Sequence, residues 1–297
     1  MAGILKRFVR LRTASAGLAV LTAVLCLTIL TLFLSPNGRG EVNLERSLRP
    51  PSLGHPFGTD PFGRDVFYRV FQGARLSLGV SFLARSISLL LGLVLGAAAG
   101  YFGGRLDSLL MRLADVTFAF PALLLLIAIM AVVSPGFVSL FVALGVVGWA
   151  SVARLVRAQV LAAREREYVQ AAKASGAGST GVILRHILPQ CLSPVLVIYT
   201  LGLGMTVMAE ASLSFLGLGV QPPDPSWGRM ISDGIGFMRT APWLTFFPGL
   251  VLTLTVCAFN MVGDGLREAL DPLSDRSRSR VTGGGDGFVG RDRVQGG

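Results

Sequence analysis

Apolar residues along this chain gather in six long stretches, which are separated by short polar or basic segments. A membrane-spanning helix needs about 20 mostly apolar residues. Six candidates approach or exceed that length: 17–34, 76–102, 114–133, 137–152, 192–213 and 244–262. Only Ser134, Pro135 and Gly136 separate the third stretch from the fourth, and this turn sequence predicts an antiparallel hairpin. The pattern predicts an all-α polytopic membrane protein with six transmembrane helices.

Composition and charge support a membrane protein. Of the 297 residues 52% are hydrophobic and only 15% are charged, whereas soluble domains carry about 25% charged residues. The net charge of +10 would suit either a nucleic-acid-binding protein or cytoplasmic loops rich in Lys and Arg. With the N-terminus inside, 18 of the 27 Lys and Arg residues lie inside and 8 outside. We therefore expect both termini in the cytoplasm and no nucleic-acid partner.

The two ends of the chain need separate interpretation. Lys6 and Arg7 followed by an apolar stretch resemble a secretory signal, but the stretch is longer than a signal core and no small-residue cleavage site follows it. A retained first helix is therefore predicted. We expect residues 1–75 to hold a tail, this helix and an outer segment, and residues 76–272 to hold a transmembrane domain of five helices. Residues 273–297 are predicted to be a disordered cytoplasmic tail.

The sequence contains no recognisable catalytic arrangement of residues. Neither Lys6 nor Lys173 stands in a phosphate-binding loop, so an ATP-driven process would need a separate ATPase. The two histidines, His55 and His186, are predicted on opposite sides of the membrane, and the cysteines have no metal-binding spacing. We expect no catalytic residue, no metal site and no cofactor, so a membrane-bound enzyme is the most distant alternative.

A few residues inside the predicted membrane helices stand out. Gly92, Gly96 and Gly100 recur every four residues, a spacing that lets helix backbones approach closely. Static packing is the favoured interpretation, and a moving contact along a pathway is the alternative. Arg85 and Glu210 are buried charges predicted in the outer half of the membrane, where they would pair or share a hydrated cavity. Without an acidic cluster at the membrane centre, a stand-alone secondary transporter is disfavoured but stays open.

The basic loop 153–191 predicts a helix–turn–helix knob on the cytoplasmic face. Its alanine-rich part after Glu167 favours a helix that Gly176 ends. Residues 181–189 predict a second short helix, stopped by Pro189. The knob is too apolar on one side for a free loop, so it needs a docking partner.

At this loop the chain resembles the ABC importer permeases. Their EAA motif reads E-A-A-x₃-G-x₉-I-x-L-P, and the matching positions here are Gln170, Ala171, Ala172, Gly176, Leu188 and Pro189. Gln170 replaces the motif's Glu, and His186 replaces its Ile. These departures, together with Glu167, are similar to the dipeptide, oligopeptide and nickel branch of that family.

Three further phrases carry the same resemblance. They are residues 57–65, residues 210–228 and residues 259–272, so the similarity spans about 52–272. Four phrases in the right order are more specific than any one of them. The chain looks most similar to the C-type component, a binding-protein-dependent transport inner membrane component.

The resemblance implies a type I ABC importer permease fold in the bacterial inner membrane, surrounded by lipid. Its implied partners are a second permease in a heterodimer, two ABC ATPase subunits and an extracytoplasmic substrate-binding protein. The implied ATPase-coupling residues are Glu167, Gln170, Ala171, Ala172, Gly176, His186, Leu188 and Pro189. Di- or oligopeptides are the expected cargo, with nickel or a nickel chelate as the alternative. His55 would touch a metal cargo or, as the favoured interpretation, serve only as a loop residue.

Overall fold

The computed structural model describes residues 7–34 and 42–270, and in these ranges every regular element is a helix. In chain order the elements are α2 (Arg12–Leu34), the 3-10 turn η1 (Leu44–Arg46), α3 (Val66–Phe102), α4 (Gly104–Ala119), α5 (Ala122–Val132), α6 (Phe137–Arg164), α7 (Glu167–Ala174), α8 (Ser179–Val182), the π-helical turn η2 (Ile183–Ile187), α9 (Leu188–Phe215), α10 (Trp227–Ile235) and α11 (Trp243–Leu270). The predicted all-α class is confirmed. The predicted tail, 273–297, lies outside the described residues.

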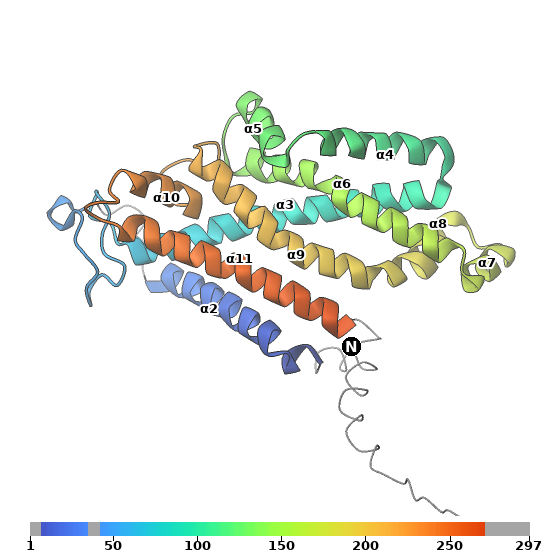
Figure 1. The fold of residues 1–297 in the computed structure, drawn as a ribbon, viewed down its shortest axis with the longest axis horizontal. Helices are drawn as coiled ribbons and strands as arrows, with labels where there is room; N and C mark the ends of the chain where they lie inside the picture. Colours follow the sequence, from blue (N-terminus) through green and yellow to red (C-terminus); the bar gives the residue numbers. More distant parts are fainter. Residues whose placement is uncertain (1–6, 35–41, 271–297) are drawn as a thin grey trace, which may run out of the picture.

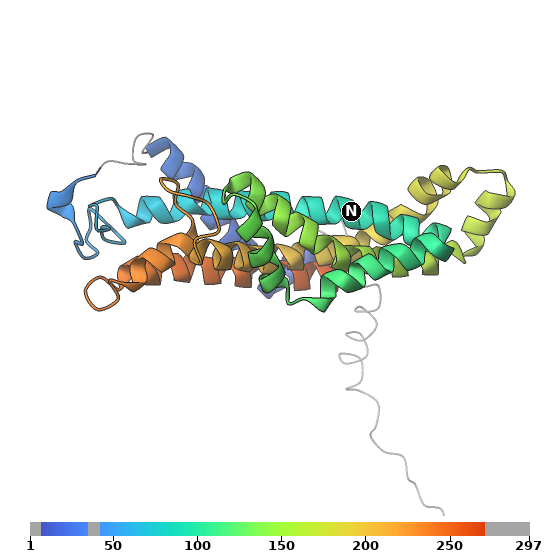
Figure 2. The same cartoon turned by 90° about the horizontal axis from the view of Figure 1, so that it is seen from above.

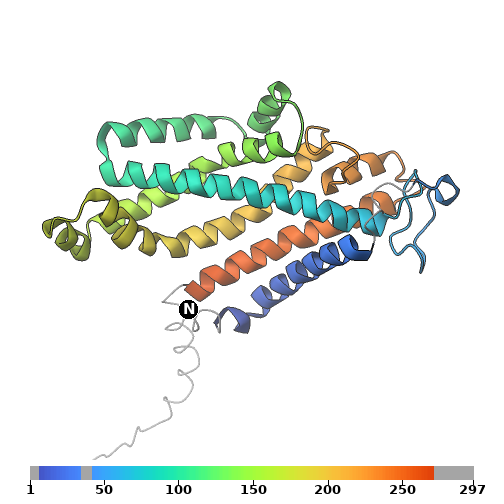
Figure 3. The same cartoon turned by 180° about the vertical axis from the view of Figure 1, so that it is seen from behind.

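The long helices form an elongated bundle with a distinct structure at each end (Figure 1). Residues 42–65, which we call the arch, lie with α10 at one end. Residues 167–187, which we call the knob, project from the other end (Figures 1 and 2). The start of α2 and the end of α11 point toward the knob end, side by side, and Gly265 of α11 packs on Ala14 of α2 (Figure 3).

Close packing of α3 against α6 forms the centre of the bundle. Gly92, Gly96 and Gly100 all face α6, where an added Cβ would collide with Val152, Ala153, Val156 and Val160. In return Gly145 of α6 faces Ile87 of α3. Small residues on both helices therefore let the backbones approach closely, as the glycine spacing predicts.

The third predicted span is not one straight helix. It divides into α4 and α5, which meet at an angle of 91° around Phe120 and Pro121. Proline lacks a backbone N–H and disfavours helical geometry in the residue before it, and Phe120 accordingly has extended dihedral angles. Five helices are long and apolar enough to cross a membrane, and the bent pair makes a sixth span if it is counted as one.

The order of two ion pairs establishes that α4 and α6 run antiparallel. Asp107, near the start of α4, accepts hydrogen bonds from Arg157, including one of 2.6 Å from Nη2, and Asp115 further along α4 pairs with the earlier residue Arg154. The predicted hairpin is therefore present, but its first arm includes α4 as well as α5.

The two pairs should contribute unequally to stability. We expect Asp107→Asn to lower the free energy of unfolding by about 1–3 kcal/mol, because the Asp107–Arg157 pair is doubly hydrogen-bonded and partly buried. The matched change Asp115→Asn removes an exposed pair and should cost about 0–1 kcal/mol. Thermal unfolding of both variants in detergent measures the difference. Equal losses would contradict this assignment.

Several predicted helix limits are wrong: α4, α6 and α11 extend beyond the predicted apolar runs, and two further limits bear on the ends of the bundle. The helix expected to begin at residue 76 begins at Val66, where the Asp65 side chain caps it by accepting from the N–H groups of Phe67 and Tyr68. Pro189 does not stop a helix but lies in the first turn of α9, where a missing N–H costs no internal hydrogen bond. The segments α8, η2 and α9 follow one another without a gap, so the knob is continuous with a long bundle helix.

Candidate functional site

The first helix of the knob, α7, ends in a defined turn at Gly176. The N–H of Gly176 donates to the carbonyl of Lys173, and the N–H of Ala177 donates to that of Ala172. This pair of bonds is the Schellman motif, which needs a left-handed residue at the turn. Gly176 has φ +81°, a conformation that side chains with a Cβ rarely adopt. The left-handed turn therefore gives a structural reason for glycine at position 176 of the EAA motif.

The base of the knob is an apolar cluster shared with the bundle. Val169 of α7, Val182 of α8 and Ile187 of η2 are fully buried. They pack in one cluster with Val156 and Val160 of α6. Each of the three short segments of the knob contributes a buried side chain to this cluster, so the knob is packed onto the bundle and is not a free loop.

Polar contacts fasten the knob further. Gln170 Nε2 donates to the carbonyl oxygen of Arg164 over 2.9 Å. A glutamate, ionised at neutral pH, offers no donor there, so this bond gives a local reason for Gln at the motif's usual Glu position. Arg164 in turn donates to the carbonyls of Gly100 and Tyr101 at the end of α3, and the ammonium group of Lys173 lies 5.3 Å from the ring centre of Tyr101.

The residues expected to couple to an ATPase gather on this knob, but they are not equally accessible. Ala172, His186 and Leu188 are partly buried, and the other five are exposed: Glu167, Gln170, Ala171, Gly176 and Pro189. Beside them lies a hollow of about 870 Å³ between the end of α6 and the starts of α7 and α9. Glu167 and Tyr168 line it on one side, and Gln190 lines it on the other. The knob thus presents small side chains outward and a recess beside them.

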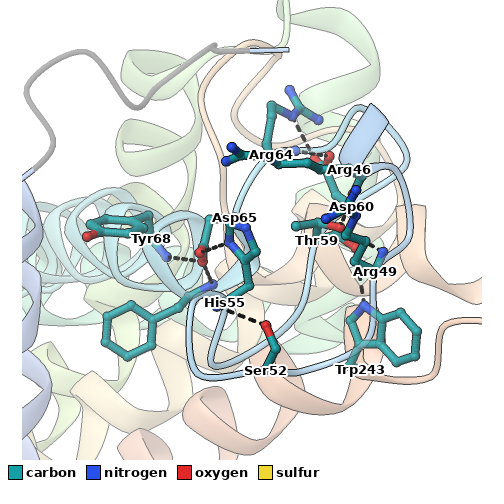
Figure 4. Close-up of polar contacts among 11 residues, drawn as sticks. Arg46, Arg49, Ser52, His55, Thr59, Asp60, Arg64, Asp65, Tyr68 and Trp243 are labelled. Carbon is teal, nitrogen blue, oxygen red and sulfur yellow. Dashed lines mark hydrogen bonds and ion pairs between the residues drawn. The ribbon is translucent and has the colours of Figure 1, made fainter. Parts of the chain in front are cut away.

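The arch at the opposite end is folded around two carboxylates (Figure 4). Asp60 accepts from the N–H groups of Phe62 and Arg64 and from Arg64 Nε at 2.6 Å. Asp65, the cap of α3, also lies 2.7 Å from Nδ1 of His55. His55 therefore has a structural contact within the arch, through the carboxylate that caps α3.

Thr59 and two glycines make the other structural contacts of the sequence motif 57–65 in the arch. The hydroxyl of Thr59 accepts from the N–H of Arg49 and donates to the carbonyl of Arg46, and its carbonyl accepts from Trp243 of α11 (Figure 4). Gly58 and Gly63 both have φ +72°, and an added Cβ on either one would strike a neighbouring segment. This phrase is therefore built to hold the arch on the bundle.

Arg85 and Glu210 are buried inside the bundle, but each is held by other groups. Arg85 Nη2 donates to the carbonyl of Ile198 over 2.6 Å, and Gly202 leaves room for its guanidinium group. Glu210 is 0% exposed and accepts from Ser214 over 2.7 Å. Between these two described residues no ion pair forms, so the direct Arg85–Glu210 contact is absent here and the shared hydrated cavity stays a prediction. Within residues 7–34 and 42–270, Arg85 Nε and Glu210 Oε2 have no hydrogen-bond partner.

Sequence reasoning missed a second hollow, which lies between the arch and α10. This arch cavity has a volume of about 700 Å³ and is lined by charged residues, among them Arg69, Asp224 and Arg229. The charged residues come from two parts of the chain, 60–69 and 224–233, that are far apart in sequence. The local signal for the site was an arginine in the first turn of a membrane helix.

Known proteins similar to this chain are transport components. The family described as "Binding-protein-dependent transport system inner membrane component" matches residues 92–276. The dipeptide transport system permease protein DppC of Alkalihalophilus pseudofirmus is 44% identical over 267 residues, covering 90% of this chain and 88% of the relative. The oligopeptide transport system permease protein OppC of Bacillus subtilis is 40% identical over 90% of this chain and 87% of its own. The glutathione transport system permease protein GsiD of Pectobacterium atrosepticum is 39% identical, with 90% and 89% covered.

Proposed function

This chain belongs to the binding-protein-dependent transport system inner membrane component family, and on that premise we propose that it is one of two permease subunits of an ATP-driven peptide importer. The knob receives a separate ATPase subunit, and a substrate-binding protein delivers cargo at the arch end. The single observation that carries the proposal is the knob, which is packed onto the bundle through a buried base and turns small, exposed side chains outward.

Rigid attachment is what mechanical coupling requires. An ATPase that closes on ATP can shift this chain between two states only if its movement reaches the membrane helices without being absorbed in a flexible loop. Val169 and Ile187 anchor the knob on α6, and η2 runs directly into α9. A displacement of the knob would therefore move α6 and α9 together.

The membrane orientation follows from the same assignment. We place the knob end in the cytoplasm, together with the start of α2 and the end of α11, which makes both termini cytoplasmic. The excess of Lys and Arg in the loops of that side supports this choice. The arch and α10 then face the outside, where the binding protein would arrive. We keep 1–75, 76–272 and 273–297 as the proposed divisions, although α3 extends across the first of these limits.

We assign di- or oligopeptides as the cargo because relatives that match 90% of the chain are named for dipeptide, oligopeptide and glutathione transport. Nickel has no observation in its favour: among the described residues no group of three or more His, Cys, Asp or Glu side chains is placed to hold a metal ion.

Replacing Ala171 with arginine tests the docking surface. Ala171 is exposed on α7, so we expect Ala171→Arg to fold normally but to weaken binding of the purified ATPase subunits at least about tenfold, because a bulky charge blocks close approach. The measurement is co-purification from membranes, followed by titration of the ATPase onto the reconstituted chain.

Ser108→Arg is the matched control, because Ser108 is exposed on α4 and outside the knob. It should bind the ATPase as the wild-type chain does. Full ATPase binding by Ala171→Arg would contradict the docking assignment. Ion-driven peptide uptake by the wild-type chain without any ATPase would instead support the secondary-transporter alternative.

A further inference from the structure

The arch cavity contains an arginine whose donors are unused. The Arg69 side chain is only 11% exposed, and the carboxylate paired with it is that of Asp60, at 3.6 Å from Nε. Arg64 and Asp233 also lie near enough to act on its charge. The distance to Asp60 is too long for a hydrogen bond, and Asp60 is already occupied by Arg64. In the described chain, therefore, no acceptor lies within hydrogen-bond distance of the Arg69 guanidinium. Buried charged groups are normally paired, so this group calls for an acceptor from outside.

Two further arginines offer donors at the same cavity. Arg64 uses Nε on Asp60, and Arg229 uses Nε on Asp233 at 2.9 Å. Within the described residues their terminal Nη groups make no hydrogen bond. Three guanidinium groups with free donors therefore meet at a single hollow, and a guanidinium group matches the two oxygens of a carboxylate.

The cavity is also lined by three carboxylates and by apolar side chains. Asp60 and Asp233 are paired with Arg64 and Arg229. Asp224 makes neither an ion pair nor a hydrogen bond within the described ranges, so its carboxylate is free to meet an ammonium group. Val66, Met230 and Leu244 are buried or nearly so and line the remaining wall. The surface thus combines free cationic donors, one free anion and apolar contact area.

We propose that the arch cavity is a subsite for short zwitterionic peptides. It binds the C-terminal carboxylate at Arg69 and the free N-terminus toward Asp224. This inference rests on the proposed function, because it assumes peptide cargo, and it adds a site on the permease itself. Bound peptide would be held at the arch end, before it enters the bundle.

The dimensions of the cavity favour a small ligand over a protein loop. Its volume of about 700 Å³ lies within the range of small-molecule pockets, roughly 300–1,000 Å³. Its deepest donor, Arg69, is mostly covered by its own chain, so a ligand must reach into the cavity to meet it.

Calorimetric titration of the purified full chain with three peptides tests the subsite. The peptides are trialanine with free ends, trialanine amide and N-acetyl-trialanine. We expect saturable binding of free trialanine and at least about tenfold weaker binding of the amide, because the amide loses a charge-assisted pair of hydrogen bonds. Acetylation should weaken binding by a smaller factor, since Asp224 is exposed.

Variants assign these preferences to residues. In Arg69→Met the free and amidated peptides should bind equally weakly, and in Asp224→Asn acetylation should no longer matter. Arg239→Met is the matched control, because Arg239 is exposed at the same end but does not line the cavity; it should behave as wild type. An unfolded Arg69→Met protein would also bind both peptides equally weakly, so its thermal unfolding in detergent is measured alongside and should match that of the wild-type chain.

Three results would overturn the subsite. They are no saturable binding of free trialanine up to about 10 mM, an undiminished preference for the free carboxylate in Arg69→Met, or unchanged peptide binding in Arg69→Met alongside weaker capture of the substrate-binding protein. The last result would make the cavity a protein contact. ATP-driven uptake of trialanine by the complete wild-type importer is measured in parallel. If uptake is intact but the subsite fails, the proposed function stands; if uptake itself fails, the proposed function falls.

Discussion

Replacing Gly176 with aspartate is expected to reduce ATP-driven uptake at least about tenfold while membrane insertion remains normal. Gly176 holds the Schellman turn at φ +81°, and a residue with a Cβ in this left-handed conformation costs about 1–2 kcal/mol. An added Cβ would meet nothing within 4 Å in this chain, so the fold itself has room for the change. The substitution would therefore disturb the end of α7 and the surface that we assign to the ATPase.

Gly178→Asp is the matched control for this experiment. Gly178 is exposed two residues further along, has φ −65° and precedes α8 as its N-cap, a position that favours aspartate. It adds the same charge to the knob without left-handed strain. We expect a clearly smaller loss of uptake than for Gly176→Asp. Normal uptake by a correctly inserted Gly176→Asp protein would contradict the coupling role of the knob.

The second large effect is expected at the contact between α3 and α6. In Gly96→Ala the new Cβ would lie 2.5 Å from the carbonyl oxygen of Ala153 and 2.9 Å from Cβ of Val156. Backbone atoms cannot give way without separating the helices, and overpacking of this kind costs about 1–3 kcal/mol. We therefore expect a lower unfolding temperature in detergent and less folded protein in the membrane.

Gly79→Ala, on the same helix, should raise the stability of the folded chain instead of lowering it. A Cβ at Gly79 meets nothing within 4 Å, so only the gain in helix propensity remains, about 0.5–1 kcal/mol. Comparing the unfolding temperatures of the two alanine variants separates the steric effect of the new Cβ from the effect of helix propensity. If both variants shifted stability in the same direction, the close contact between α3 and α6 would not be the reason for the glycine stripe.

Much of the fold could be predicted because membrane helices leave a direct mark on the sequence. Lipid requires long apolar runs with internally satisfied backbones, so the length of each run predicts a span. The limits of the runs were less certain, because a helix can extend beyond the apolar part. α3 begins at Val66, where Asp65 caps it, and α6 continues to Arg164. The break in the third span at Pro121 left a local signal that hydropathy alone overlooks.

The knob was predictable for a different reason, since its end is set locally. Gly176 and the alanine-rich run before it determine where α7 stops, and both are adjacent in the chain. The role of Pro189 was not predictable in this way. A proline can end one helix or begin the next, and which of these occurs depends on how the preceding turn, η2, continues into α9.

The sequence by itself determined the helical class, five of the six predicted spans, the glycine contact surface and the position of the knob. Each of these depends on residues near one another in the chain. Only the tertiary structure decided what Arg85 and Glu210 touch, how Val169 anchors the knob, and that Arg69, Asp224 and Arg229 line one cavity. These contacts join segments that are far apart in the sequence. Their geometry follows from helix packing and from the path of the arch, which periodicity does not encode.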